Sequence, residues 1–140
     1  MRITKNVLSF ASIFLLVGST ACSTLHKSAT LQGMWAGREI GASPETPRNL
    51  VMSGKTFEFR GADPEDWGKG TYSLREDTRP RQLILAIKQC GIPDYVGKTA
   101  YAIYKLEGVT LTLAGSAPGS AAPPANFDTP DARRFEFKKQ

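Results

Sequence analysis

The stretch Ala102-Ile103-Tyr104-Lys105-Leu106-Glu107-Gly108-Val109-Thr110-Leu111-Thr112-Leu113 decides the fold class of this chain. Apolar and polar residues alternate on both sides of Glu107-Gly108, which is typical of two half-buried antiparallel strands joined by a two-residue turn. On the apolar side of this hairpin, the expected pairs are Leu106 with Val109, Tyr104 with Leu111, and Ala102 with Leu113.

The same alternation recurs from residue 32 to the end of the chain, in short runs separated by Gly, Pro, Asp and Asn, and no run has the period of a helix. A second turn, at Ser53-Gly54, places Leu50, Met52, Phe57 and Phe59 on one face. Short strands with mostly short links predict an all-β domain, an eight-stranded antiparallel up-and-down barrel. The expected strands are Met34–Ile40, Asn49–Met52, Thr56–Arg60, Gly70–Leu74, Gln82–Lys88, Thr99–Leu106, Val109–Ala114 and Arg133–Lys138.

Alternation also assigns the other side chains that point into the barrel. They are Trp35, Tyr72, Leu74, Leu83, Leu85, Ile87, Phe135 and Phe137. An eight-stranded barrel is either just filled by its side chains or holds one small ligand. The many large aromatic side chains on the inner face therefore predict a small cavity or none.

The composition excludes several classes of function. The 140 residues have room for one domain, and 18 basic stand against 13 acidic side chains. The basic residues accompany no nucleic-acid-binding motif, so no nucleic-acid partner is expected. His26 is the only His, and the sequence has no phosphate loop and no cluster of metal ligands. We therefore expect no enzyme activity, no cofactor and no metal.

The N-terminal segment, residues 1–21, has the three parts of a secretory signal peptide. Arg2 and Lys5 come first, an apolar run follows from Val7 to Val17, and small residues precede Cys22. The apolar run is shorter than the roughly 20 residues that a bilayer-spanning helix needs. Export of the mature chain is therefore expected.

The four residues Ser19-Thr20-Ala21-Cys22 resemble the lipobox of bacterial lipoproteins, whose Cys is acylated and becomes the new N-terminus. Ser19 departs from that pattern, because an aliphatic residue usually stands there. Ordinary signal peptidase would cut the same bond and leave Cys22 available for a disulfide with Cys90. The favoured expectation is a lipid-anchored protein of the cell envelope, at the outer membrane if the host has one. Residues 22–31 then form the lipidated Cys and its tether, and residues 32–140 form the domain.

A larger set of motifs resembles a family of small exported bacterial proteins that are described as lipocalin-like and have no characterised function. The matching elements are Leu31-Gln32-Gly33-x-Trp35, Gly70-x-Tyr72-x-Leu74, Gly97, Ile103-Tyr104-x-Leu106-x-Gly108-x-x-Leu111-x-Leu113, Pro124-x-x-Phe127 and a closing Phe-rich basic strand. Their order and spacing cover nearly all of residues 31–140. Glu107 and Pro123 depart from the pattern, since members often have Asp and a basic residue there. The resemblance implies a lipocalin-like barrel and no particular activity.

This resemblance favours a non-catalytic envelope lipoprotein whose barrel binds a small apolar or amphiphilic ligand at one mouth. The residues expected to line that site are Trp35, Phe57, Phe59, Tyr72 and Tyr104. The alternative is a protein-binding module of the envelope, similar to small barrel-shaped inhibitors, with its function in the loops Asp63–Lys69 and Ala114–Ala132.

Three further side chains have expected places. Lipocalins stack a late basic residue on the first-strand Trp, and antiparallel pairing of the first and last strands makes Lys139, rather than Arg133, the partner of Trp35. Glu39 shares the inward parity of Trp35 and is a candidate polar group at the barrel mouth. Phe127 is expected to dock from the long loop onto the barrel.

Overall fold

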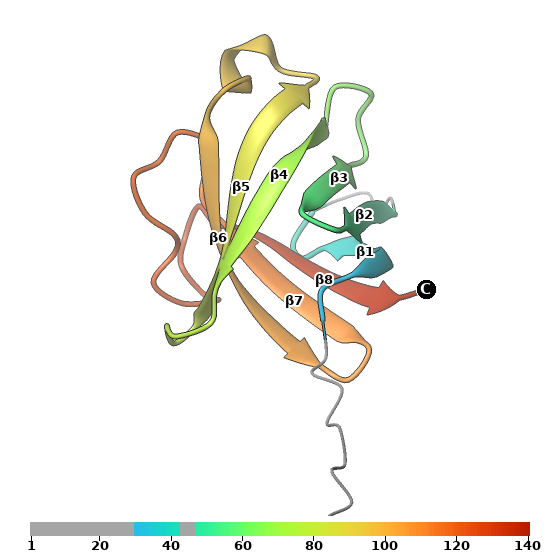
Figure 1. The fold of residues 1–140 in the computed structure, drawn as a ribbon, viewed down its shortest axis with the longest axis vertical. Helices are drawn as coiled ribbons and strands as arrows, with labels where there is room; N and C mark the ends of the chain where they lie inside the picture. The colour runs from blue at the N-terminus through green and yellow to red at the C-terminus, as the bar shows by residue number, and fades with distance from the viewer. Residues whose placement is uncertain (1–29, 43–46) are drawn as a thin grey trace, which may run out of the picture.

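The alternating segments form eight strands, and the polar and glycine-rich segments form the connections (Figure 1). The computed structural model describes residues 30–42 and 47–140. The strands are β1 (Gly33–Glu39), β2 (Arg48–Ser53), β3 (Thr56–Arg60), β4 (Trp67–Arg75), β5 (Arg81–Cys90), β6 (Thr99–Glu107), β7 (Thr110–Gly115) and β8 (Arg133–Lys139). A short 3-10 turn, η1 (Pro93–Tyr95), lies between β5 and β6. All eight predicted strands are confirmed.

Each strand pairs antiparallel with the next, and β8 pairs with β1, which closes the sheet. The predicted up-and-down barrel is therefore confirmed. The β2–β3, β4–β5 and β6–β7 connections lie at one end of the barrel, with the start of β1 and the end of β8. We call this the closed end, and the opposite end, with the other four connections, the open end.

The expected signal peptide (1–21), Cys22 and most of the expected tether (22–31) lie outside the described residues. Leu31, the last residue of that tether, is only 3% exposed and belongs to the barrel core. The core takes no described residue before Leu31, and every strand is paired on both sides within residues 33–139. A chain that begins at Ser23 therefore contains the complete barrel. In the described part of the chain, no helix has the length and apolar character needed to cross a membrane.

Both tight turns lie one residue later than predicted. They consist of Gly54-Lys55 and Gly108-Val109, and each Gly has a φ of +59°. Only the first central residue of each turn has a positive φ. This is the pattern of a type II′ turn, which has Gly first, whereas the prediction placed Gly second, as in an Asn-Gly type I′ turn.

The displaced turn changes the register of the β6–β7 hairpin. The observed pairs are Leu106 with Leu111, Tyr104 with Leu113, and Ala102 with Gly115, so the predicted pairs were wrong by two residues. A shift of two residues leaves each strand side chain on its predicted face. Val109 is the exception, because it lies in the turn and is 61% exposed. In the β2–β3 hairpin, the predicted inner-face residues Leu50, Met52, Phe57 and Phe59 do share one face.

Large side chains fill the closed end of the barrel. Trp35, Met52, Leu111 and Phe137 are at most 1% exposed. The indole Nε1 of Trp35 donates a hydrogen bond to the Leu31 carbonyl (2.9 Å), which satisfies its buried N–H.

The stacking partner predicted for Trp35 is confirmed. Lys139 lies opposite Trp35 in the β1–β8 ladder, and its ammonium is 5.6 Å from the centre of the indole ring. Such a cation–π contact is worth about 0.5–2 kcal/mol. Here it covers the core at the closed end.

Gln32 ties the segment before β1 to the β2–β3 turn. Its Nε2 donates to the Gly54 carbonyl (2.8 Å), and its Oε1 accepts from the Gly54 N–H (2.7 Å). The Tyr72 hydroxyl donates to the same carbonyl (3.0 Å) and accepts from Gln32 Nε2. These bonds satisfy the Gln32 amide and the Gly54 backbone, and they close this end of the barrel above Leu31 and Trp35.

The long connection between β7 and β8 lies along the outer face of β6 (Figure 1). The Ser116 N–H donates to the Tyr101 carbonyl (2.9 Å). Ile103 points outward from β6 but is only 1% exposed, because this connection covers it. The predicted docking of Phe127 on the barrel is confirmed, since the Lys105 ammonium lies 5.7 Å from the centre of its ring.

Closure of the barrel generates a prediction at Gly37 in β1. A Cβ at this position would lie 1.9 Å from the Glu136 carbonyl oxygen and 2.7 Å from the Phe137 Cα, which are backbone atoms of β8. We expect Gly37→Ala to lower the free energy of unfolding in urea by at least about 2 kcal/mol, because β8 has to move. Gly115→Ala is the matched control, since its Cβ would meet its nearest atoms at 3.9 and 4.0 Å. Equal losses in both variants would contradict this account.

Candidate functional site

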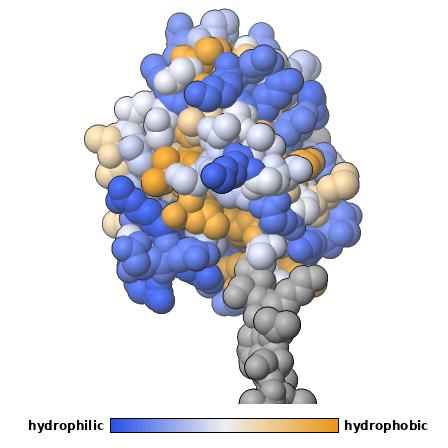
Figure 2. Space-filling view, viewed as in Figure 1, coloured by the Kyte–Doolittle hydropathy of each residue, from blue (hydrophilic) through white to orange (hydrophobic). Residues whose placement is uncertain are grey.

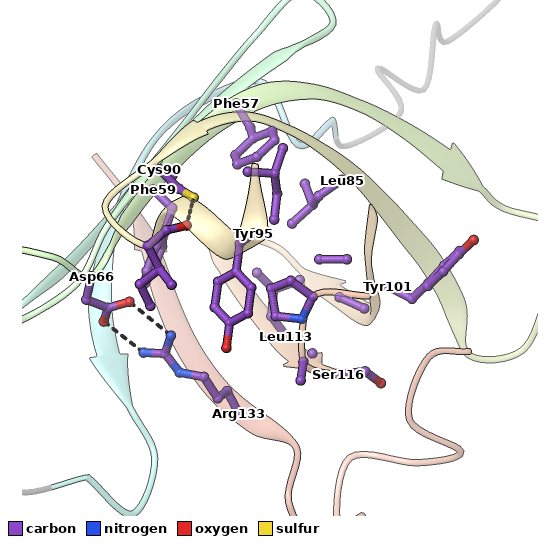
Figure 3. Close-up of a pocket in the computed structure, with 18 of the residues that line it drawn as sticks. Phe57, Phe59, Asp66, Leu85, Cys90, Tyr95, Tyr101, Leu113, Ser116 and Arg133 are labelled. Carbon is purple, nitrogen blue, oxygen red and sulfur yellow. Dashed lines mark hydrogen bonds and ion pairs between the residues drawn. The ribbon is translucent and has the colours of Figure 1, made fainter. Parts of the chain in front are cut away.

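A cavity of about 340 Å³ occupies the open half of the barrel (Figure 3). Small-molecule sites commonly have volumes of about 300–1,000 Å³, so this cavity suits a compact ligand. Its inner wall is formed mainly by apolar side chains. These are Phe57, Phe59, Leu83, Leu85, Ile87, Ala100, Ala102, Leu113 and Phe135. Of the two predicted alternatives, a small cavity or none, the structure has the small cavity.

Three connections form the rim of the cavity. The β3–β4 connection contributes Asp66, the β5–β6 connection contributes Ile92 and Tyr95, and the β7–β8 connection contributes Pro118. Figure 3 shows the Tyr95 side chain projecting from η1 into the opening. The wall is therefore built by strands and the entrance by loops, so the two can vary independently.

The cavity exists because the inward positions of the open half carry small residues. Ala100 and Ala102 on β6, Gly115 on β7 and Gly68 on β4 all line it. The next inward position of β6 toward the closed end is Tyr104, which is 3% exposed. Side chains thus taper from large to small along the barrel axis, which leaves space at one end only.

Four charged side chains form an ion cluster at the open end, which we call the rim cluster: Glu39, Arg48, Asp66 and Arg133. The Arg133 guanidinium donates to Glu39 through Nε and Nη2 (both 2.8 Å). It also donates to Asp66 through Nη1 and Nη2 (3.0 and 2.9 Å). Arg48 Nη2 donates to Glu39 at 3.3 Å. Carboxylates therefore engage all three nitrogens of Arg133, in two bidentate pairs.

The guanidinium of Arg133 also lies over aromatic rings of the cavity. Its central carbon is 5.1 Å from the centre of the Phe135 ring and 5.8 Å from that of Phe59. Stacking of this kind stabilises a cation at an apolar wall. Ion pairing and stacking together hold Arg133 in one place between the wall and the rim.

Pairing within the rim cluster shifts the ionisation of its members. Hydrogen bonding to Arg133 lowers the pKa of Glu39 below its usual value of 4.5, against the effect of burial, and Arg48 lowers it further. Hydrogen bonding to Glu39, and then to Asp66, raises the pKa of Arg133. Glu39 is therefore ionised at neutral pH. With two basic and two acidic members, the rim cluster is neutral as a whole.

Cys90 lines the cavity, and residues 30–42 and 47–140 include no His beside it. The thiol donates a hydrogen bond to the Ile92 carbonyl (2.9 Å). A nucleophilic Cys needs a base within hydrogen-bond reach, and the only His of the chain, His26, lies outside the described residues. Cys22, the alternative disulfide partner of Cys90, lies outside them as well.

The described residues also provide no metal centre. Across residues 30–42 and 47–140, no three His, Cys, Asp or Glu side chains lie close enough together to hold a metal ion. In the acidic segment Asp63–Asp66, Asp66 binds the Arg133 guanidinium instead.

The structure separates the five residues that the sequence suggested for the ligand site. Phe57 and Phe59 line the cavity. Trp35 and Tyr104 are buried toward the closed end, at 1% and 3% exposure, and Tyr72 bonds to the β2–β3 turn there. Burial raises the pKa of Tyr72 and of Tyr104. The cavity therefore contains the two Phe residues and none of the other three.

The small residues that create the cavity and the ion pairs that form its rim were not predicted from the sequence. Ala100, Ala102 and Gly115 were visible as small residues at inward positions, and comparing residue size along each strand would have located the space. Arg133 and Asp66 are 67 residues apart, and only barrel closure brings them together. Glu39 was placed at the barrel mouth and does lie there, with a side chain that is 15% exposed.

The rim cluster predicts a pH-dependent loss of stability in Glu39→Gln. At about pH 7 we expect this variant to have a free energy of unfolding lower by about 1–3 kcal/mol, because Arg48 and Arg133 lose a charged acceptor. The pKa of Glu39 is lower in the folded protein than its ordinary 4.5. Its contribution is thus fully present above that value and is lost as the pH falls through the folded pKa.

Urea unfolding from about pH 7 down to about pH 3 measures this effect. The difference between the wild type and Glu39→Gln should shrink as the pH falls. Glu58→Gln is the matched control, since Glu58 is an exposed carboxylate on β3 without an ion pair among the described residues. A difference that stayed constant over the pH range would show that the charge of Glu39 is not what stabilises the rim.

Comparison with protein-family models, with curated proteins and with solved structures found no significant match. The likeness to lipocalin-like proteins therefore stays a prediction from sequence motifs. The barrel, the cavity and the rim cluster are the observations from which a function has to be argued.

Proposed function

We propose that this protein is a non-catalytic, lipid-anchored protein of the cell envelope that takes up a small apolar or amphiphilic molecule. The single observation that carries the ligand-binding part is the cavity of about 340 Å³, which is apolar inside and opens at one end of the barrel. When an apolar ligand displaces water from the apolar surface of a concave site, the free energy of the system falls, which favours binding.

The rim cluster favours an uncharged ligand. Arg133 is the basic side chain of the cavity lining, and its three nitrogens already bind Glu39 and Asp66. An anionic ligand group would have to displace one of these carboxylates. A neutral molecule, or an amphiphile whose polar group stays in water, leaves the rim cluster intact.

The proposed anchor agrees with the direction in which the chain enters the barrel. Leu31 lies under the closed end, so the residues before it reach the domain there. A lipid on Cys22 would tether the domain to the membrane through its closed end. The tether would be attached away from the open end, where a ligand can enter from the aqueous phase.

A protein-binding module is a second proposal, and apolar side chains at the open end favour it. Ile92 and Val96, on the β5–β6 connection, are 39% and 49% exposed. The two loops expected to bind a partner, Asp63–Lys69 and Ala114–Ala132, contribute to the rim of the same cavity. If no apolar probe enters the cavity, this second proposal becomes the favoured one.

Filling the cavity tests the ligand-binding proposal. Ala100 lines the cavity, and Ala100→Trp would occupy part of its volume. We expect the wild-type chain from Ser23 onward to bind the uncharged fluorophore N-phenyl-1-naphthylamine with a blue-shifted, enhanced emission. Ala100→Trp should weaken this binding at least about tenfold, which corresponds to about 1.4 kcal/mol.

The matched control for this experiment is Ala121→Trp. Ala121 is an exposed residue of the β7–β8 connection that does not line the cavity. Circular dichroism and thermal unfolding check that both variants keep the fold. Equal affinity in wild type and Ala100→Trp would place the fluorophore outside the cavity and refute the proposal.

The proposed anchor has its own test, the intact mass of the mature protein extracted from its native membrane. We expect the mass of a chain that begins at Cys22 and carries a diacylglyceryl group and an N-acyl chain. We expect Cys22→Ser to remove the lipid mass and release the protein from the membrane fraction. A wild-type protein with an unmodified N-terminus would refute lipidation without affecting the cavity proposal.

A further inference from the structure

Charge is distributed unequally between the two ends of the barrel. We compare the connections of each end together with the last two residues of each strand there. At the closed end the basic residues are Lys55, Arg75, Arg79, Arg81, Lys138 and Lys139, and the acidic residues are Glu76, Asp77 and Glu107. At the open end the described basic residues are Arg38, Arg48, Arg60, Lys98, Arg133 and Arg134, and the acidic ones are Glu39, Asp63, Glu65, Asp66, Asp94, Asp128 and Asp131. The closed end therefore carries the positive charge of the domain.

The basic side chains of the closed end also differ from those of the open end in their ion pairing. Glu39 and Asp66 neutralise Arg133 at the open end, and Asp128 pairs with Arg134. None of the six basic residues of the closed end forms an ion pair with a carboxylate of the described residues. With six basic against three acidic residues, this end keeps an excess of positive charge.

Two exposed apolar side chains accompany these charges. Met34 and Val109 are 62% and 61% exposed, the highest values among the large apolar residues of the described chain. Lys139 lies between them, because its N–H donates to the Val109 carbonyl (2.9 Å) and Gln140 donates to the Met34 carbonyl (2.9 Å). Two strand spacings, about 10 Å, therefore separate the backbones of the two residues. In Figure 1, the β4–β5 and β6–β7 connections lie in the lower half of the view. Figure 2, in the same view, shows apolar surface among hydrophilic side chains in that half.

A groove at the same end brings two of these basic residues together with Lys105. It is lined by Arg79, Arg81 and Lys105, with Glu76 as the carboxylate among its lining residues, and with the Phe127 ring on one side. The Arg81 guanidinium lies 5.1 Å from the centre of the Tyr104 ring, which is also part of the groove. The groove, which we call the basic groove, offers guanidinium and ammonium donors to an anionic oxygen group.

We propose that the closed end is a docking surface for a bilayer that contains anionic phospholipids. The unpaired basic residues attract the negatively charged headgroups, and the basic groove binds one phosphate. Met34 and Val109 insert between the headgroups. The argument for a bilayer as the partner is the position of the chain entry, since the 29 residues before Thr30, with the apolar segment and Cys22, join the domain at this end.

Contact of the closed end with a bilayer would add to attachment by a lipid on Cys22. A lipid on a flexible tether limits the distance of the barrel from the membrane but leaves its orientation free. Contact through the closed end sets the orientation as well, with the cavity facing away from the bilayer. Because the contact does not require Cys22, it can be tested in a chain that cannot be lipidated.

The experiment is co-sedimentation of the chain from Ser23 onward with phospholipid vesicles. We expect binding to vesicles of phosphatidylcholine with 30 mol% phosphatidylglycerol, weak binding to pure phosphatidylcholine vesicles, and loss of binding at high salt. In Lys55→Gln/Arg75→Gln/Arg79→Gln, binding to the anionic vesicles should fall at least about tenfold, since each basic residue at the surface contributes to the attraction. In Met34→Ser/Val109→Ser, binding at low salt should fall by a smaller factor, because the electrostatic attraction remains.

The matched control is Arg60→Gln/Lys69→Gln/Lys88→Gln, which removes the same charge from exposed positions away from the closed end. It should bind like the wild type. A fall equal to that of the closed-end variant would show attraction by net charge alone and overturn the proposal. Equal wild-type binding to both kinds of vesicle would also overturn it. A dimer in solution that Met34→Ser/Val109→Ser abolishes would assign this end to a second copy of the chain instead.

Nitroxide labels test the orientation directly. In a Cys90→Ser background, single labels at Val109→Cys and Ile92→Cys report the closed and the open end. On anionic vesicles, the Val109 label should become less accessible to a water-soluble nickel relaxant, and the Ile92 label should not. The reverse result would place the open end on the membrane and overturn the proposal, while the fluorophore experiment on the cavity remains independent of it.

Discussion

Five residue pairs between β1 and β8 turn the eight-stranded sheet into a barrel. The same ladder sets Lys139 over Trp35 at the closed end and brings the start of β8 to the open end beside Glu39. Gly37 permits this approach, because no side chain fits between the two backbones. From its place on β8, Arg133 then reaches across the opening to Asp66. The floor, the wall and the rim of the cavity therefore all depend on one strand pairing.

Much of this arrangement was predictable from the sequence, and the remainder has identifiable reasons. A strand with one buried face has a period of two, so alternation predicted the strands and the side of nearly every residue. The predicted positions of the two turns were wrong by one residue. Gly suits either central position of a two-residue turn, and only the backbone φ values show which position it occupies. The position of the cavity was not predicted, because a count of inward aromatic residues does not say where along the barrel axis each one lies. Trp35 and Tyr104 point inward near the floor, while Ala100 lies near the opening. Arg133 and Asp66 pair only after closure, and no local pattern connects them.

The two ends of the barrel have different proposed roles. The open end holds an apolar cavity behind a rim whose charges cancel, which suits uptake of an uncharged molecule. The closed end has a filled core, an excess of basic side chains and two exposed apolar residues, which suits contact with an anionic bilayer. The residues that seal the closed end, including Gln32 and Tyr72, also separate the cavity from that contact. If both proposals hold, a ligand would exchange with the aqueous phase rather than directly with the membrane.

The closure of the barrel also has a consequence for the nascent chain. Seven of the eight strand pairings join neighbours in sequence, whereas the last joins Trp35 to Lys139. Pairing over such a long loop costs more chain entropy and forms slowly. Until Arg133–Lys139 has been synthesised, β1 has one edge without a partner, and such an edge is a template for pairing with another chain. The first strand to be made, β1, is thus the one that stays longest without its second partner. The exposed edge of β1 is covered only when β8 is complete.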